Sequence, residues 1–195
     1  MLDLHSRKIV GWAMAAQMPA TLVCAALQMA IAQRNPKPGL VVHSDRGSQY
    51  ASSQHQALLT KHGLVGSMSR KGNCWDNAVM ERFFLNLKME RVWQKDYANH
   101  AEASTDVADY IVNFYHGERL HATLGNLSPI AFEHQSAIKK PIEVSKCPKR
   151  LDHHKQRWLV FYVAAGDKSG WIRCLSCVFL RSISSGESAK RAAMS

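Results

Sequence analysis

Blocks of apolar residues separated by short polar segments run through the first two thirds of the chain, and their lengths predict strands interspersed with helices. Residues 2–12 predict a hairpin that turns at 5–7, because two short apolar runs flank a polar tripeptide. Residues 20–33 are apolar nearly all round, which predicts a largely buried helix. Strands are further expected at 40–43 and 64–68, and helices at about 53–61 (capped by Ser52 or Ser53 and stopped by Gly63), from 76 or 77 onward, at about 101–115 and from 128–129. Strands that alternate with helices indicate an α/β architecture.

The pattern changes after about residue 138. The residues beyond it show no clean periodicity, although apolar islands lie at 161–165 and 172–180. We therefore expect one unit over 1–138 and a basic tail over 139–195 whose fold the pattern does not predict. The charge supports this division, since the net charge is +2 over residues 1–135 and +8 over residues 136–195. A basic tail can bind phosphates non-specifically by releasing counterions.

The composition is that of a globular protein, with 46% hydrophobic and 21% charged residues. No run of about 18 apolar residues occurs, so no membrane span is predicted. The first residues have no apolar signal core, and the five cysteines form an odd, scattered set that is typical of reduced thiols. These features predict a cytoplasmic protein rather than a membrane or exported one.

Two acidic residues, Asp45 and Glu81, stand out, with 35 residues between them. Asp45 closes an apolar run and opens a polar turn, whereas Glu81 lies one turn inside a predicted amphipathic helix. Taken singly, Asp45 is an ordinary turn former and Glu81 an ordinary residue of a solvated helix face. Together, a carboxylate at a strand end and another on a helix can share a divalent cation, as in phosphoryl-transfer enzymes. Lys88 follows Glu81 by seven residues, so both project from one helix face, about 10 Å apart along the axis. A metal ligand and a cation so placed suit a phosphodiester backbone.

Several motifs resemble those of insertion-sequence transposases in the DDE, or retroviral-integrase, superfamily. Residues 43–50, His-Ser-Asp-Arg-Gly-Ser-Gln-Tyr, resemble the family's second acidic motif, and residues 72–88 resemble its third. The segments 2–12, 115–121 and 127–129 resemble its early hairpin and its closing segment. The family pattern is two Asp and a Glu, with 35 residues between the last pair, as here, and a basic residue seven after the Glu.

The resemblance implies an integrase catalytic core with a ribonuclease-H-like fold, in which helices flank a mixed sheet. It implies DNA cleavage and strand transfer, with Mg²⁺ or Mn²⁺ as cofactor. DNA would be the partner, as the element's terminal repeats and as target, and the intact protein would form a homo-oligomer. Asp45 and Glu81 would be catalytic metal ligands, and Lys88 would hold the element's terminal DNA. Arg46 and Arg91 are further candidates for DNA contact.

The chain departs from the family pattern at its start. The family's first Asp belongs to a strand that precedes the hairpin and lies between it and the strand ending at Asp45, whereas this chain begins inside the hairpin. Asp3 lies beside the hairpin turn and is expected to form that turn rather than to replace the first Asp. We therefore expect a core that lacks its first strand, leaves two strand edges unpaired, and belongs to a truncated, inactive copy. The alternative is a non-enzymatic nucleic-acid-binding remnant that interferes with intact transposase.

The tail has two interpretations. It is either read-through into flanking DNA, with no evolved fold, or a zinc-dependent interaction module. A zinc cluster would use Cys147, His153 or His154, Cys174 and Cys177. A single Cys-x-x-Cys pair without a matched second pair does not by itself define a zinc site.

Overall fold

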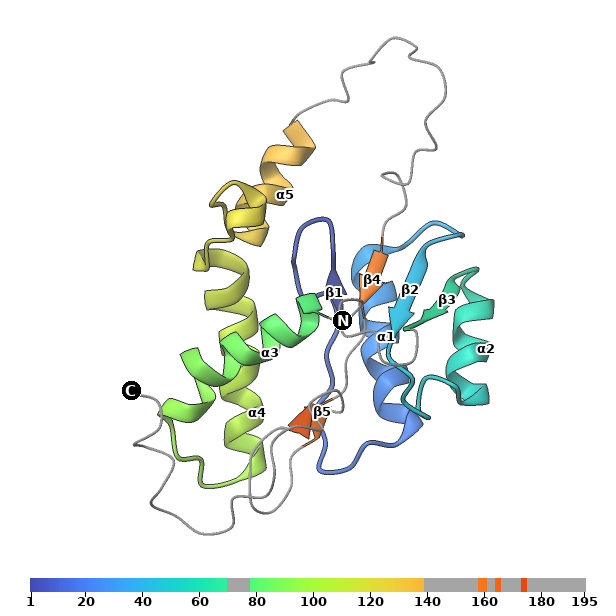
Figure 1. The fold of residues 1–195 in the computed structure, drawn as a ribbon, viewed down its shortest axis with the longest axis horizontal. Helices are drawn as coiled ribbons and strands as arrows, with labels where there is room; N and C mark the ends of the chain where they lie inside the picture. Colours follow the sequence, from blue (N-terminus) through green and yellow to red (C-terminus); the bar gives the residue numbers. More distant parts are fainter. Residues whose placement is uncertain (70–77, 139–157, 161–163, 166–172, 175–195) are drawn as a thin grey trace.

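The computed structural model describes residues 1–69, 78–138, 158–160, 164–165 and 173–174, and arranges them as helices around a mixed sheet (Figure 1). The elements in chain order are β1 (Leu2–Asp3), α1 (Ala20–Arg34), β2 (Val41–Ser44), α2 (Ser53–Lys61), β3 (Val65–Met68), α3 (Ala78–Glu90), the 3₁₀ turn η2 (Val92–Gln94), α4 (His100–Asp109), the π-helix η3 (Tyr110–Glu118), the 3₁₀ turn η4 (Ala122–Leu124), α5 (Pro129–Ile138), β4 (Trp158–Val160), β5 (Ala164–Ala165) and β6 (Arg173–Cys174). Within these ranges, none of the helices combines the length and the apolar character that crossing a membrane requires.

The helix predicted at 101–115 changes type along its length. α4 ends at Asp109, and the chain continues into η3 as a π-helix, which the sequence did not predict. The buried residues of η3 repeat at a spacing of five, which is the hydrogen-bond spacing of a π-helix; they are Tyr110, Ile111, Tyr115 and His116. The wider turn therefore brings both pairs to one face, which a helix of 3.6 residues per turn would not do.

The larger sheet has the strand order β1-β4-β2-β3 (Figure 1). β4 runs antiparallel to β1, with Leu2 opposite Val160, and parallel to β2, with Val41 beside Trp158. β2 also pairs with β3 in parallel. We expected two unpaired edges between the hairpin and the strand before Asp45, and the structure instead pairs both edges with three residues of the 139–195 segment. The remaining strands, β5 and β6, form a separate antiparallel pair.

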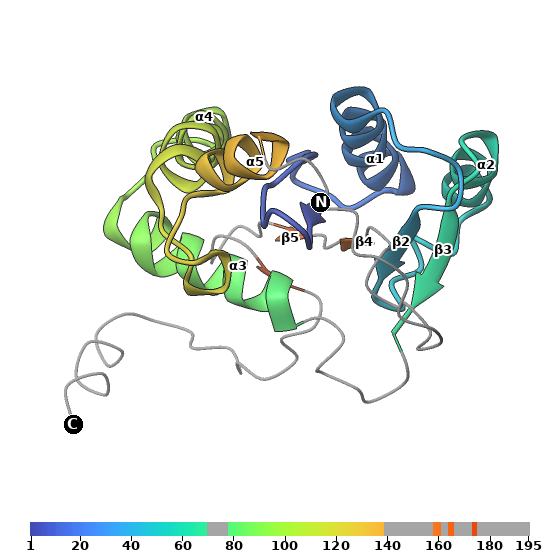
Figure 2. The ribbon, with the colours of Figure 1, turned by 90° about the horizontal axis from the view of Figure 1, so that it is seen from above.

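Two hydrophobic cores lie against the hairpin, one on each side. Along the hairpin, Leu2 and Ile9 belong to one core, whereas their neighbours Met1 and Val10 belong to the other. This follows from extended backbone, in which successive side chains point to opposite faces. The first core is completed by residues of α3, α4 and η3, and the second by residues of α1, α2 and β2. Figure 2 shows α3, α4 and α5 grouped on one side of β1, and α1 and α2 on the other.

Candidate active site

Asp45 lies in the turn that follows β2, and a local hydrogen bond holds its side chain. Asp45 Oδ1 accepts a hydrogen bond from the Gly47 backbone N–H at 2.9 Å. A Cβ atom added to Gly47 would lie 3.0 Å from this oxygen and 2.8 Å from Gln49 Oε1, so a larger residue here would displace these two side chains. The Asp-Arg-Gly sequence therefore fixes one carboxylate oxygen at the carboxyl end of a buried strand.

Hydrogen bonds of polar side chains connect the carboxyl ends of β2 and β3. His43 hydrogen-bonds with Ser67 Oγ through Nδ1 at 3.1 Å and with Ser69 Oγ through Nε2 at 3.2 Å. Arg46 reaches the same point, because its Nε donates to the Ser69 backbone oxygen at 2.9 Å. These contacts hold the residues on either side of Asp45 against the end of β3. Sequence reasoning missed the two serines, since their role depends on the parallel pairing of β2 with β3.

Glu81 lies in the first turn of α3, beside the buried side of that helix. The buried residues of α3 are Met80, Phe83 and Leu87, whereas Glu81 and Lys88 are half-buried. The seven-residue spacing puts Glu81 and Lys88 nearly two full turns apart, on a shared face. In Figures 1 and 2 the first turn of α3 is the end of that helix nearest to β2. Asp45 thus comes from a strand end and Glu81 from a helix.

The donor types suit a hard divalent cation, but the number of acids is small. Carboxylate oxygens are the ligands that Mg²⁺ and Mn²⁺ prefer, and Asp45 and Glu81 bring two carboxylates. Within the described part of the chain, no three His, Cys, Asp or Glu side chains cluster closely enough to hold a metal ion. β4, the strand next to β2, consists of Trp158, Leu159 and Val160 and brings no acid.

Comparison with known proteins gives the family. The integrase core domain is matched twice, over residues 1–74 and over residues 62–129. The transposase for insertion sequence element IS904 from Lactococcus lactis is 44% identical over 132 residues, which are 68% of this chain and 52% of that protein. Transposase InsF for insertion sequence IS3fB from Escherichia coli is 43% identical over 136 residues, 70% of this chain and 47% of that protein.

The chain belongs to the integrase-core family of insertion-sequence transposases. It spans about half the length of the curated relatives that it matches. Its mixed sheet and flanking helices are accordingly those of an integrase core, as the motifs predicted. Among solved structures, the catalytic core domain of BIV integrase matches with a TM-score of 0.45 and 19% identity, over 64% of this chain and 76% of that one.

The basic residues predicted to contact DNA differ in how far their charge is already neutralised. Among the described residues of the integrase core, the Lys88 side chain has no hydrogen bond or ion pair. Arg91, by contrast, contacts Asp106 through Nε at 2.9 Å and Asp109 through Nη2 at 2.7 Å. Burial favours a higher pKa for Asp106, but hydrogen bonds from Arg91, Lys95 and a tyrosine hydroxyl outweigh it and hold the pKa at about 2. Arg91 therefore ties the end of α3 to α4.

Asp3 has the structural role expected of it. Its Oδ1 accepts a hydrogen bond from the His5 backbone N–H at 2.9 Å, which shapes the hairpin turn. Its Oδ2 lies 3.4 Å from Arg34 Nη2 of α1. Arg34 also pairs with Glu133 of α5, and Lys8 lies 3.3 Å from the same carboxylate. These charges connect the hairpin, α1 and α5.

His116 fastens the hairpin to η3. Its Nε2 accepts a hydrogen bond from the Ile9 backbone N–H at 3.1 Å, inside the protein. Burial, reinforced by the nearby Lys8 charge, lowers the pKa of His116 to about 4. The ring is therefore neutral at pH 7, as an accepting nitrogen requires. The sequence motif included this histidine but did not reveal its partner.

Of the residues considered for a zinc cluster, one lies among the described residues. Cys174 lies in β6, where it pairs with Ala164. Cys147, His153, His154 and Cys177 lie outside the described residues.

Proposed function

We propose that this integrase core is the catalytic region of a DNA transposase in which Asp45 and Glu81 hold Mg²⁺ or Mn²⁺. The observation that carries the proposal is the Asp45 turn, in which the Gly47 backbone N–H holds a carboxylate at the end of a buried strand, with 35 residues between Asp45 and a helical Glu. A bound cation supplies Lewis-acid polarisation of a phosphodiester. The chain's own residues position the DNA, with Lys88 and Arg46 contacting backbone phosphates. The partner is DNA, as terminal repeats and as target, and the working form is a homo-oligomer.

We also infer that this chain has little strand-transfer activity. By resemblance, the family's first Asp lies on a strand between the hairpin and the strand that ends at Asp45. β4 holds that position here, and its three residues carry no acid. Two carboxylates bind a hard cation more weakly than three, and a pair of cations needs a bridging carboxylate.

A second candidate function is DNA binding without catalysis, in which the chain competes with intact transposase. The charge distribution favours it, since residues 136–195 carry a net charge of +8. Such binding weakens steeply as salt is raised, because it depends on counterion release.

Mn²⁺ binding tests the metal site directly. Titration followed by electron paramagnetic resonance should show weak binding that is reduced in Asp45→Asn and in Glu81→Gln. The matched control is Asp96→Asn, which removes an exposed acid in the segment after η2 and should leave the titration unchanged. Equal binding by all four proteins would refute the metal site.

A DNA cleavage assay separates the two functions. With labelled element ends and Mn²⁺, we expect DNA retention without cleavage above the Asp45→Asn background. Cleavage that depends on Asp45 would show an active enzyme and overturn the inference of low activity.

Val160→Asp adds a carboxylate at the register position beside His43, two residues before Asp45. This variant is expected to tighten Mn²⁺ binding, whereas Val160→Asn is not.

A further inference from the structure

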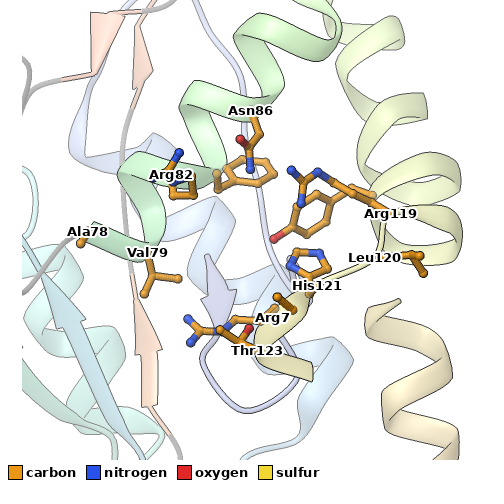
Figure 3. Close-up of a pocket in the computed structure, with 12 residues that line it drawn as sticks. Arg7, Ala78, Val79, Arg82, Asn86, Arg119, Leu120, His121 and Thr123 are labelled. Atoms are coloured by element: carbon orange, nitrogen blue, oxygen red, sulfur yellow. The ribbon is translucent and has the colours of Figure 1, made fainter. Parts of the chain in front are cut away.

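A hollow with a volume of about 450 Å³ lies against α3. It is formed by the hairpin turn, α3, η3 and the segment that follows η3 (Figure 3). The lining residues are Arg7, Ala78, Val79, Arg82, Phe83, Asn86, Tyr115, Arg119, Leu120, His121, Ala122 and Thr123. Among these described residues there are three arginines and no acid, so the hollow is basic. We call it the arginine pocket.

Two of the three arginine charges are not neutralised within the described residues. Arg119 donates to Glu90 through Nε at 3.0 Å and through Nη2 at 2.8 Å, so its charge is already paired. For Arg7 and Arg82, the described part of the chain supplies no side-chain hydrogen bond or ion pair. Two uncompensated guanidinium groups at one hollow attract an anion, and the planar guanidinium suits phosphate oxygens in particular.

The backbone at Arg7 supports a role for its side chain. Arg7 has φ 61°, in the left-handed region where glycine or asparagine is usually found. A hydrogen bond from the Arg7 N–H to the Asp3 oxygen at 2.7 Å holds this turn. An arginine at such a position places a long cation in the lining of the pocket at a cost in backbone strain.

His121 provides a third polar group. Its Nε2 is buried and has no hydrogen-bond partner among the described residues. Burial, and then the charges of Arg119 and Arg7, lower the pKa of His121 to about 4, so the ring is neutral at pH 7. A neutral imidazole with an unsatisfied nitrogen can donate one N–H to an anion oxygen. Figure 3 shows His121 between Arg119 and Thr123, with Arg82 and Asn86 opposite on α3.

We propose that the arginine pocket binds a backbone phosphate of a DNA strand, with Arg7, Arg82 and His121 as its donors. The apolar side chains of Val79, Phe83 and the exposed Leu120 also line the pocket, and the attached sugar would contact them. Arg82 follows Glu81 in α3, and its side chain projects about 100° around the helix from that of Glu81, so the arginine pocket and the Glu81–Lys88 face are two neighbouring surfaces of one helix. The proposal rests on the proposed transposase function, to which it adds a second contact region beside the metal site.

Salt-dependent DNA binding tests the pocket. Arg7→Ala, Arg82→Ala and the double variant are compared with wild type by fluorescence anisotropy on a labelled duplex between 50 and 200 mM salt, a range over which binding to phosphates weakens strongly. Each single variant should bind severalfold more weakly, and the slope of log K against log salt should fall by about 0.9 for each phosphate that the variant no longer neutralises. Arg82→Lys, which keeps the charge, should retain the wild-type slope.

Lys37→Ala is the matched control, because it removes one exposed cation from the loop between α1 and β2, far from the arginine pocket in sequence. If the double variant matches Lys37→Ala in affinity and slope, the proposal is overturned. Competition with inorganic phosphate at constant ionic strength separates the sources of phosphate, since displacement of DNA at millimolar phosphate would assign the pocket to a free anion instead. Circular dichroism melting confirms that each variant is folded.

Mn²⁺ titration of the same proteins keeps this proposal separate from the metal site. If Mn²⁺ binding ignores Asp45 and Glu81 while the arginine variants still weaken DNA binding, the metal site fails and the pocket stands. If Mn²⁺ binding depends on both acids while DNA binding ignores both arginines, the pocket alone is refuted.

Discussion

Both sides of the integrase core have an apolar core, but the polar contacts that accompany it differ. On the side of α3, α4 and η3, charged pairs connect the elements, such as Glu90 with Arg119 and Arg91 with Asp106. On the side of β2, β3, α1 and α2, the contacts are apolar packing and hydrogen bonds of short side chains, such as those of His43. The proposed metal ligands come one from each side. Their relative position therefore depends on what joins the sides, which includes the hairpin, β4 and the ion pair of Arg34 in α1 with Glu133 in α5.

The largest expected effect comes from removing one of these joining elements. Deleting residues 139–195 removes β4 and leaves backbone groups of β1 and β2 unpaired. We expect the two sides to lose their common cooperative transition in thermal unfolding followed by circular dichroism. A peptide covering residues 155–163 should restore the transition when added in trans, and the same peptide with Leu159→Pro should not. An unchanged melting curve after deletion would show that β4 does not join the sides.

Core truncations test whether the two sides unfold as one unit. Leu87→Ala in the first core and Leu27→Ala in the second each remove a fully buried leucine from a helix. Each should lower the free energy of unfolding by roughly 2–5 kcal/mol. In urea, tryptophan fluorescence and circular dichroism should give one midpoint for both variants. Two separate midpoints would mean that the cores unfold independently.

Acid should loosen the contact between the hairpin and η3. The pKa of His116 in the folded protein is about 4, below the ordinary value of 6.5, so the unfolded chain binds more protons between these pH values. The stability that His116 contributes is therefore complete above pH 6.5 and is lost as the pH falls toward 4, by up to about 3 kcal/mol. Melting temperatures measured across this range should fall less steeply for His116→Gln. If the melting temperature depended on pH equally in wild type and in His116→Gln, His116 would not be the group responsible.

The smallest effects should distinguish structural from DNA-contacting cations on α3 and just beyond it. Arg91→Ala should cost about 1 kcal/mol, since its ion pairs are partly exposed. Lys88→Ala should change stability by less than about 0.5 kcal/mol and yet weaken DNA binding. Urea unfolding measures the stability of the two variants, and fluorescence anisotropy measures their DNA binding. The reverse pattern would make Arg91 the DNA contact.

The sequence predicted those elements whose signals are local. Ser52 caps α2 by accepting a hydrogen bond from the His55 N–H, and Gly63, at φ 64°, follows its end. Both features were expected, because a cap and a left-handed stop depend on residues within one turn. The Asp45 turn is equally local, since its glycine lies two residues away.

The features that the sequence did not predict depend on distant partners. β4 pairs Trp158 with Val41 and Leu159 with Asp3, and nothing in three apolar residues identifies such remote neighbours. The π-helix follows from packing against the first core, which overrides the ordinary helical period. Likewise, the pairing of Arg91 with Asp106 becomes visible only once α3 and α4 are placed together.

Neighbouring residues of the hairpin alternate between the two cores, as in Met1, Leu2, Ile9 and Val10. This alternation limits where the chain can gain or lose a residue. A one-codon insertion or deletion within the hairpin would exchange inward-facing residues between the cores, because the side-chain period of extended backbone is two. The same change in the exposed loop at 35–39 would move no core residue. Length changes among descendants of this sequence should therefore accumulate in that loop and be purged from the hairpin.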